Sequence, residues 1–198
     1  MSAPDPLGRG PELTIAERPR SVVSLAPRRG RAQALAEAVR HGFGLDLPGP
    51  GRFTTGEAVN ATAIQPAVWL LDGAPEAPGA LHARVAEAAG GLAAVVDQSH
   101  GRSLLRLTGT AARAVLATCC RLDLHPRAFP PGAAATTLLA HVSCTVRGFA
   151  GGFELLVGST YAAWLIEELV EASAAHGALL VPAPAPHRSA MPAAEHAR

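Results

Sequence analysis

Short β-prone runs alternate with amphipathic helical stretches along this chain of 198 residues. Runs rich in Val, Ile, Leu and Thr predict strands, whereas apolar residues repeated at i, i+4 and i+7 predict helices. The predicted strands are residues 13–17, 22–25, 61–65, 67–71, 92–96, 102–107, 136–147, 153–157 and 179–181. The predicted helices are residues 31–41, 79–89, 111–119 and 160–175. This order predicts an α+β fold with two halves, about residues 13–92 and 93–181, each an antiparallel sheet with helices on one face.

The stretch from Val95 to Gly109 connects these halves in the sequence. Two β-branched valines are followed by the turn formers Asp97, Ser99 and Gly101, and Arg102 then begins an alternating run. Gly109 precedes the helix predicted at residues 111–119. Two short strands separated by a polar turn predict a β-hairpin, here one that leads into a helix.

Charge, composition and hydropathy limit the class of protein. The 17 basic residues, all arginine, and the 16 acidic residues give a net charge of +1, and aromatic residues make up 4% of the chain. Because nucleic-acid-binding proteins usually carry a basic stripe with stacking aromatics, that class is disfavoured. Residues 1–12 predict a flexible lead-in without the apolar core of a signal peptide, and residues 182–198 predict a disordered tail. No stretch approaches the ~20 apolar residues of a membrane span, so we expect a cytoplasmic protein.

Motifs for catalysis or metal binding are missing from the sequence. It contains no GxGxxG, GxxxxGK[ST] or GxSxG motif, and its histidines form no HxH or HExxH pattern. Three cysteines, Cys119, Cys120 and Cys144, have neither the number nor the spacing of a disulfide framework or a zinc site, and we expect them to be small buried thiols. His100 in the predicted turn and His141 in the predicted strand 136–147 are interpreted as structural or surface residues. We therefore expect no catalytic, cofactor-binding or metal-binding residues in this chain.

The last predicted helix carries the one feature that indicates a protein partner. Trp164 shares a helix face with Glu167, Glu168 and Glu171, at i+3, i+4 and i+7, opposite the apolar stripe. An exposed tryptophan is a common anchor of protein interfaces. We interpret these four residues as a candidate partner interface. The alternative is that Trp164 folds over the helix edge onto a neighbouring loop.

A long succession of residues resembles one protein family. It runs from residue 95 to the end of the last helix, and the resemblance extends more weakly back to about residue 40. The residues that carry it are Asp97, Ser99, Gly101, Arg102, Gly109, Ala112, Leu116, Asp123, Leu124, Pro126, Phe129, Gly132, Thr136 to Leu138, His141 and Phe153 to Leu155. They resemble the gamma subunit of heterotetrameric sarcosine oxidase, a family similar in turn to the folate-binding domain of glycine-cleavage aminomethyltransferases.

The resemblance implies a fold and a place in a complex. The fold would consist of two ferredoxin-like halves around a central cavity, with Asp97, Ser99, Gly101, Arg102 and Gly109 forming the architectural turn between them. The chain would be an accessory, non-catalytic subunit bound to large alpha and beta flavoprotein subunits and a small delta subunit. Those partners would hold FAD, FMN, NAD and tetrahydrofolate and convert sarcosine to glycine, with formaldehyde or methylenetetrahydrofolate and hydrogen peroxide as the other products.

Two departures from the aminomethyltransferase pattern argue against folate chemistry in this chain. His141 and Val142 align with the acidic pair that handles the folate, and Ala111 replaces an aspartate that often follows Gly109. A group that could act as an acid or base toward a folate amine is therefore missing from that strand. Three alternatives stay open: a stand-alone folate-binding protein of the aminomethyltransferase type, the gamma subunit of a related N-methyl amino acid oxidase or dehydrogenase, and an interaction module unrelated to amine oxidation.

Overall fold

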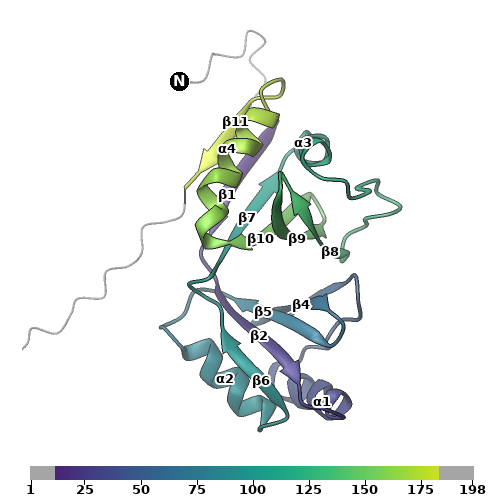
Figure 1. Cartoon of the computed structure of the whole chain (residues 1–198), viewed down its shortest axis with the longest axis vertical. Coiled ribbons are helices and arrows are strands. Elements are labelled where there is room, and N and C mark those ends of the chain that lie inside the picture. Colours follow the sequence, from purple (N-terminus) through teal and green to yellow (C-terminus); the bar gives the residue numbers. More distant parts are fainter. Residues whose placement is uncertain (1–11, 183–198) are drawn as a thin grey trace, which may run out of the picture.

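The computed structural model describes residues 12–182, so the lead-in and tail predicted at the two ends lie outside the described residues, apart from Glu12 and Pro182. It contains two sheets, and each forms its own lobe with helices beside it (Figure 1). The α+β fold predicted from the sequence is confirmed. Within residues 12–182, no helix is long and apolar enough to cross a membrane.

The lobe drawn at the bottom of Figure 1 is a ferredoxin-like unit with one added strand. Its elements are β2 (Ser21–Pro27), α1 (Ala32–Phe43), β3 (Phe53–Thr55), β4 (Val59–Gln65), β5 (Val68–Gly73), α2 (Ala80–Ala89) and β6 (Ala93–Asp97). The strand order β3-β4-β5-β2-β6 is antiparallel throughout. We refer to this sheet as sheet B.

Close packing of the two helices of this lobe depends on a glycine. Leu35 and Val39 of α1 are buried, as their i, i+4 spacing predicts. We expect from the sequence that Gly42 ends this helix, but the helix continues to Phe43 and Gly44 caps it with a φ of 62°. Gly42 instead faces α2, because a Cβ added there would lie 2.9 Å from the Cβ of Ala88. This glycine therefore lets α1 and α2 approach each other.

The other lobe repeats the same arrangement with two added strands. Its elements are β1 (Leu13–Arg18), β7 (Arg102–Thr108), α3 (Ala112–Cys119), β8 (Ala134–Leu139), β9 (Val142–Phe149), β10 (Gly152–Gly158), a 3₁₀ turn η1 (Ser159–Tyr161), α4 (Ala162–Ala172) and β11 (Ala178–Val181). The order is β11-β1-β7-β10-β9-β8, and only the β1–β11 pair is parallel. We refer to this sheet as sheet A.

The chain crosses between the sheets twice, and both crossings correct a prediction. β1 pairs with β7 and β11 in sheet A, whereas β6 pairs with β2 in sheet B, so the chain does not divide into halves at residues 92 and 93. Strands β6 and β7 lie in different sheets, and the predicted hairpin between them is therefore wrong. Both predicted segments form strands, but β6 pairs with β2, and β7 pairs with β1 and β10, all of which are far away in the sequence.

The strand predicted over residues 136–147 is two strands. β8 and β9 form a hairpin that turns at Ala140 and His141, whose φ values are 45° and 73°. Positive φ at both central residues is the mark of a tight two-residue hairpin turn. His141 consequently lies in an exposed turn and not in a strand. Because neither residue is glycine or asparagine, the sequence lacked the usual signal for this turn.

Each lobe has its own apolar core. In the sheet A lobe, buried residues of β1, β7, β9 and β10 pack with α3 and α4, including Leu165 and Leu169. In the sheet B lobe, buried residues of β2, β4 and β5 pack with α1 and α2.

Candidate functional site

The turn that connects β6 to β7 is fastened to both lobes by hydrogen bonds. Asp97 accepts a hydrogen bond from the backbone N–H of Ser99, with 2.9 Å between Oδ1 and N. The hydroxyl of Ser99 accepts from the N–H of Val22 on β2 at 3.0 Å and donates to its carbonyl at 3.3 Å. On the other side, Ser159 donates from its N–H to the carbonyl of Gly101 at 3.1 Å. The predicted turn residues thus lie at the crossing between the sheets.

These contacts change the pKa of the Asp97 carboxyl group. The hydrogen bonds from Ser99 hold the pKa of Asp97 below its ordinary value, against a small opposing effect of burial, and electrostatic interactions with His82 and His100 lower it further. A carboxylate that accepts hydrogen bonds is stabilised in its charged form. Asp97 is therefore a carboxylate that holds the turn, and not a proton donor at neutral pH.

Gly109, the last of the predicted turn residues, is required where β7 ends. Its φ is 112°, and a Cβ added there would lie 2.2 Å from the carbonyl oxygen of Glu12. The same carbonyl accepts a hydrogen bond from the N–H of Ala111, at 3.0 Å. The start of β1 therefore passes directly over this glycine, and only a residue without a side chain fits. Gly109 lies twelve positions after Asp97 and belongs to a different contact.

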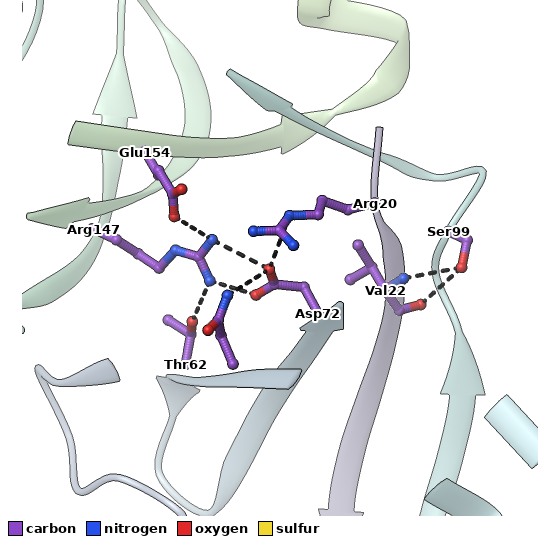
Figure 2. A network of polar contacts seen from close by, with 8 residues as sticks. Arg20, Val22, Thr62, Asp72, Ser99, Arg147 and Glu154 are labelled. Atoms are coloured by element: carbon purple, nitrogen blue, oxygen red, sulfur yellow. Dashed lines mark hydrogen bonds and ion pairs between the residues drawn. The ribbon is translucent and has the colours of Figure 1, made fainter. Parts of the chain in front are cut away.

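A second group of polar residues, which the sequence analysis missed, lies between the sheets (Figure 2). At its centre the guanidinium of Arg147, on β9, is fully buried and donates to Asp72 of β5 through both terminal nitrogens. One of these nitrogens, Nη2, also donates to Oε2 of Glu154 on β10 at 2.6 Å, and the other, Nη1, donates to the hydroxyl of Thr62 on β4 at 3.1 Å. Arg147 and Glu154 come from sheet A, and Asp72 and Thr62 come from sheet B. The ion pair between Arg147 and Asp72 thus joins the two lobes.

Two further groups contact the carboxylate of Asp72. Asn60 donates to Oδ2 at 3.2 Å, and Nε of Arg20, in the first crossing between the sheets, lies 3.6 Å from the same oxygen. The ring of Phe53 lies under the guanidinium of Arg147, with 5.4 Å between Cζ and the ring centroid. Burial alone would lower the pKa of Arg147, but the charges and hydrogen bonds of Asp72 and Glu154 outweigh it and hold this pKa above the ordinary value. Arg147 is therefore charged at every accessible pH.

The sequence contained a signal for this network. Arg147, Asp72 and Glu154 each interrupt an otherwise apolar strand, in TVRGF, WLLDG and FELLV. Charged residues are rarely buried unless they are paired, so three isolated charges in core strands indicate one buried group of ion pairs. Which charge pairs with which depends on how the two sheets face each other, and local sequence does not encode that.

A cavity of about 410 Å³ adjoins this network and is the place to test for a folate. Arg20, Asn60, Asp72, Arg106 and Glu154 line it together with Phe53 and Phe149. Its two network carboxylates, Asp72 and Glu154, both accept hydrogen bonds from Arg147. Both carboxylates are thus already engaged with an arginine, whereas Glu57, which also lines the cavity, is exposed.

The four residues of the predicted partner interface all lie on α4. Ala162, Leu165 and Leu169 face the core, and Trp164 retains 37% of its surface exposed on the opposite side of the helix. Glu167 and Glu171 are exposed, whereas Glu168 is half-buried. The outward orientation of Trp164 matches the interpretation from helix spacing. Its role in binding a partner stays a prediction.

A groove on the surface of the sheet A lobe was not predicted from the sequence. It has a volume of about 880 Å³ and lies between the end of α3, the β8–β9 turn and α4. Glu168 and Glu171 line it, which connects the predicted interface to a defined hollow of the surface. Trp164 and Glu167 lie outside this groove.

The three cysteines differ in their surroundings. Cys119 and Cys120 are half-buried and line the groove, whereas Cys144 is buried in the core of the sheet A lobe. Burial raises the pKa of Cys119 and raises the pKa of Cys144 to about 12. These thiols are weak nucleophiles, because the thiolate is the reactive form. Among residues 12–182, no group of three or more His, Cys, Asp or Glu residues could hold a metal ion.

Comparison with known sequences gives one consistent family. Residues 29–175 match the sarcosine oxidase, gamma subunit family. The chain is 39% identical over 125 residues to the sarcosine oxidase subunit gamma of Corynebacterium sp. (strain P-1), a match that covers 61% of this chain and 58% of the relative. It is 40% identical over 92 residues to the same subunit of an Arthrobacter species, covering 44% of this chain and 45% of that one. The chain thus spans about half the length of the relatives it matches.

Comparison with solved structures agrees with the fold. A chain of the heterotetrameric sarcosine oxidase from Corynebacterium sp. U-96, in complex with pyrrole 2-carboxylate, superposes with a TM-score of 0.75 at 27% identity, covering 86% of this chain and 89% of that one. Aminomethyltransferase T of the glycine cleavage system from Bartonella henselae superposes with a TM-score of 0.66 at 16% identity, covering 86% of this chain and 48% of that one. At that identity the second match shows a shared fold alone. Both resemblances predicted from the sequence are confirmed.

Proposed function

The chain belongs to the sarcosine oxidase gamma subunit family, and we propose that it is the accessory, non-catalytic gamma subunit of a heterotetrameric oxidase that demethylates sarcosine to glycine. The expected cytoplasmic location stays a prediction. The observation that carries the proposed role is the outward face of α4, where Trp164 is 37% exposed among three glutamates. A half-exposed tryptophan on a helix is suited to anchor a protein interface.

The proposal assigns the redox chemistry to other chains. We propose that the alpha and beta subunits hold FAD, FMN, NAD and tetrahydrofolate, that a small delta subunit completes the complex, and that this chain holds none of these groups. The pairing of Asp72 and Glu154 with Arg147 supports this assignment, because two of the three carboxylates that line the cavity are already engaged with an arginine. The choice between sarcosine and another N-methyl amino acid would then rest with the flavin-containing partner.

The turn residues have an architectural role in this proposal. Ser99 binds β2 of sheet B, and Gly101 accepts a hydrogen bond from the segment that follows β10 of sheet A. The turn is thus held at both ends, which supports a function in fixing how the lobes meet. A partner that contacts both lobes would require this orientation to be constant.

Co-expression of this chain with the candidate partner subunits encoded by neighbouring genes tests the proposed role. We expect a yellow flavoprotein complex to co-purify with the tagged chain, and Trp164→Ala to weaken its assembly. Val96→Ala is a matched control, because Val96 is 49% exposed but lies on β6 at the edge of sheet B. A colourless, folded chain that ignores these subunits would contradict the proposal.

Calorimetry with a reduced folate separates this proposal from the alternative of a stand-alone folate-binding protein. We expect no heat of binding to the isolated chain at micromolar concentrations. Micromolar binding would favour the alternative and would require a site other than the paired carboxylates of the central cavity.

A further inference from the structure

The groove beside α4 has two walls of opposite charge and an apolar lining. Glu168 and Glu171 lie on one side, and Arg121 lies beyond the end of α3 on the other. The lining also includes Leu138, which is 62% exposed, Ala140 and His141. Leu138 gives a segment bound in this groove an apolar side chain to contact.

The charged groups of the groove lack partners within the described part of the chain. The ion pairs and side-chain hydrogen bonds found among residues 12–182 involve neither Glu168 nor Glu171 nor Arg121. The α4 wall carries no basic residue, since the sequence of the helix is AAWLIEELVEA. Its potential is therefore negative and favours a positively charged group.

The acidic wall continues beyond the groove. Trp164 lies one turn before Glu168, at i and i+4, and therefore on the same side of α4. A segment bound in the groove can extend along the helix and cover the indole. This arrangement gives an apolar anchor at one end and a charged wall at the other.

We infer that the groove between α3, the β8–β9 turn and α4 binds an amphipathic segment of a partner subunit, with Arg or Lys side chains against Glu168 and Glu171 and apolar side chains against Leu138. An acidic side chain of the same segment pairs with Arg121. The two opposed walls fix the orientation of the bound segment, because reversing it would place like charges together. This inference rests on the proposed function, since it assigns a docking site within the same complex.

Charge removal on the acidic wall tests the inference in the assembled complex. The double variant Glu168→Gln and Glu171→Gln is expected to lower the affinity for the partner subunits by about tenfold and to reduce the salt dependence of binding. Glu37→Gln and Glu87→Gln form a matched control, because these glutamates lie on α1 and α2 of the other lobe. The control is expected to bind like the parent chain.

The occupant is identified by photo-crosslinking from position 138, with position 96 as the control site. The expected product joins position 138 to a partner-subunit segment that contains Arg or Lys. A crosslink to residues 183–198 of the same chain, or to a second copy, would overturn the inference. The inference would also be overturned if the parent chain forms the complex and the Glu168→Gln and Glu171→Gln double variant binds with the same affinity and the same salt dependence. Failure of the parent chain itself to assemble would instead contradict the proposed function.

Discussion

The guanidinium of Arg147 and the carboxylate of Asp72 form a fully buried ion pair across the two sheets, between residues 75 positions apart in the sequence. Figure 2 shows that Thr62, Glu154 and Arg20 complete the group. Because Arg147 belongs to one lobe and Asp72 to the other, the pair is formed only when the lobes have their native orientation. The network thus couples the folding of each sheet to the way in which the sheets meet.

Removing the positive charge of this network should destabilise the chain strongly. In Arg147→Met, Asp72 and Glu154 stay buried without their main partner, and breaking a buried ion pair in this way costs about 3–5 kcal/mol. Urea unfolding measures the loss. Arg40→Met is the matched control, because Arg40 and Asp46 form an exposed pair at 3.8 Å that should contribute less than about 1 kcal/mol. Equal losses in the two variants would contradict a stabilising role for the network.

Gly109→Ala should also destabilise the chain. A side chain at a φ of 112° is strained, and its Cβ would lie 2.2 Å from the carbonyl oxygen of Glu12. Backbone strain of this kind costs about 1–3 kcal/mol, and moving β1 away adds to it. Thermal unfolding of Gly109→Ala and Gly49→Ala tests this, since a Cβ at Gly49 meets no atom within 4 Å. A midpoint for Gly109→Ala as high as that of Gly49→Ala would argue against the close approach.

The turn at Asp97 should contribute a small pH-dependent part of the stability. Hydrogen bonds from Ser99 place the pKa of Asp97 in the folded chain below the ordinary value of 3.8. A carboxyl group with a lowered pKa stabilises the fold above that value and loses this effect as the pH falls through the folded pKa. Asp97→Asn should therefore differ most from the parent chain in urea unfolding at pH 5 to 7 and converge with it below pH 3.8. A difference that is constant across this range would exclude the charge of Asp97 as its source.

Much of the fold could be predicted from the sequence, because strand and helix patterns are local. The helices beginning at Ala80, Ala112 and Ala162 match the predicted segments closely. The pairing of strands is not local. β1 and β6 each join the sheet of the other expected half, since the hydrogen-bonding edges that accept them form only in the folded chain.

The candidate site was predictable to a similar degree. Helix spacing placed Trp164 and its glutamates on the outer face of α4, and turn residues marked the crossing at Ser99. The groove and the Arg147 network are formed by segments that are far apart in the sequence, so only the tertiary structure brings them together. Three charges in apolar strands were the available signal for the network, but they did not indicate their pairing.

The cysteines provide a last prediction, which concerns accessibility. Cys119 and Cys120 line the groove and are half-buried, whereas Cys144 is 1% exposed and burial raises its pKa to about 12. A thiol-alkylating reagent at pH 8 should therefore label Cys119 and Cys120 of the native chain slowly and leave Cys144 unlabelled until the chain unfolds. If a partner segment occupies the groove, assembly of the complex should slow the labelling of Cys119 and Cys120. Mass spectrometry of the labelled peptides measures both effects, and equal labelling of these two cysteines in the free chain and in the complex would show that the groove stays open after assembly.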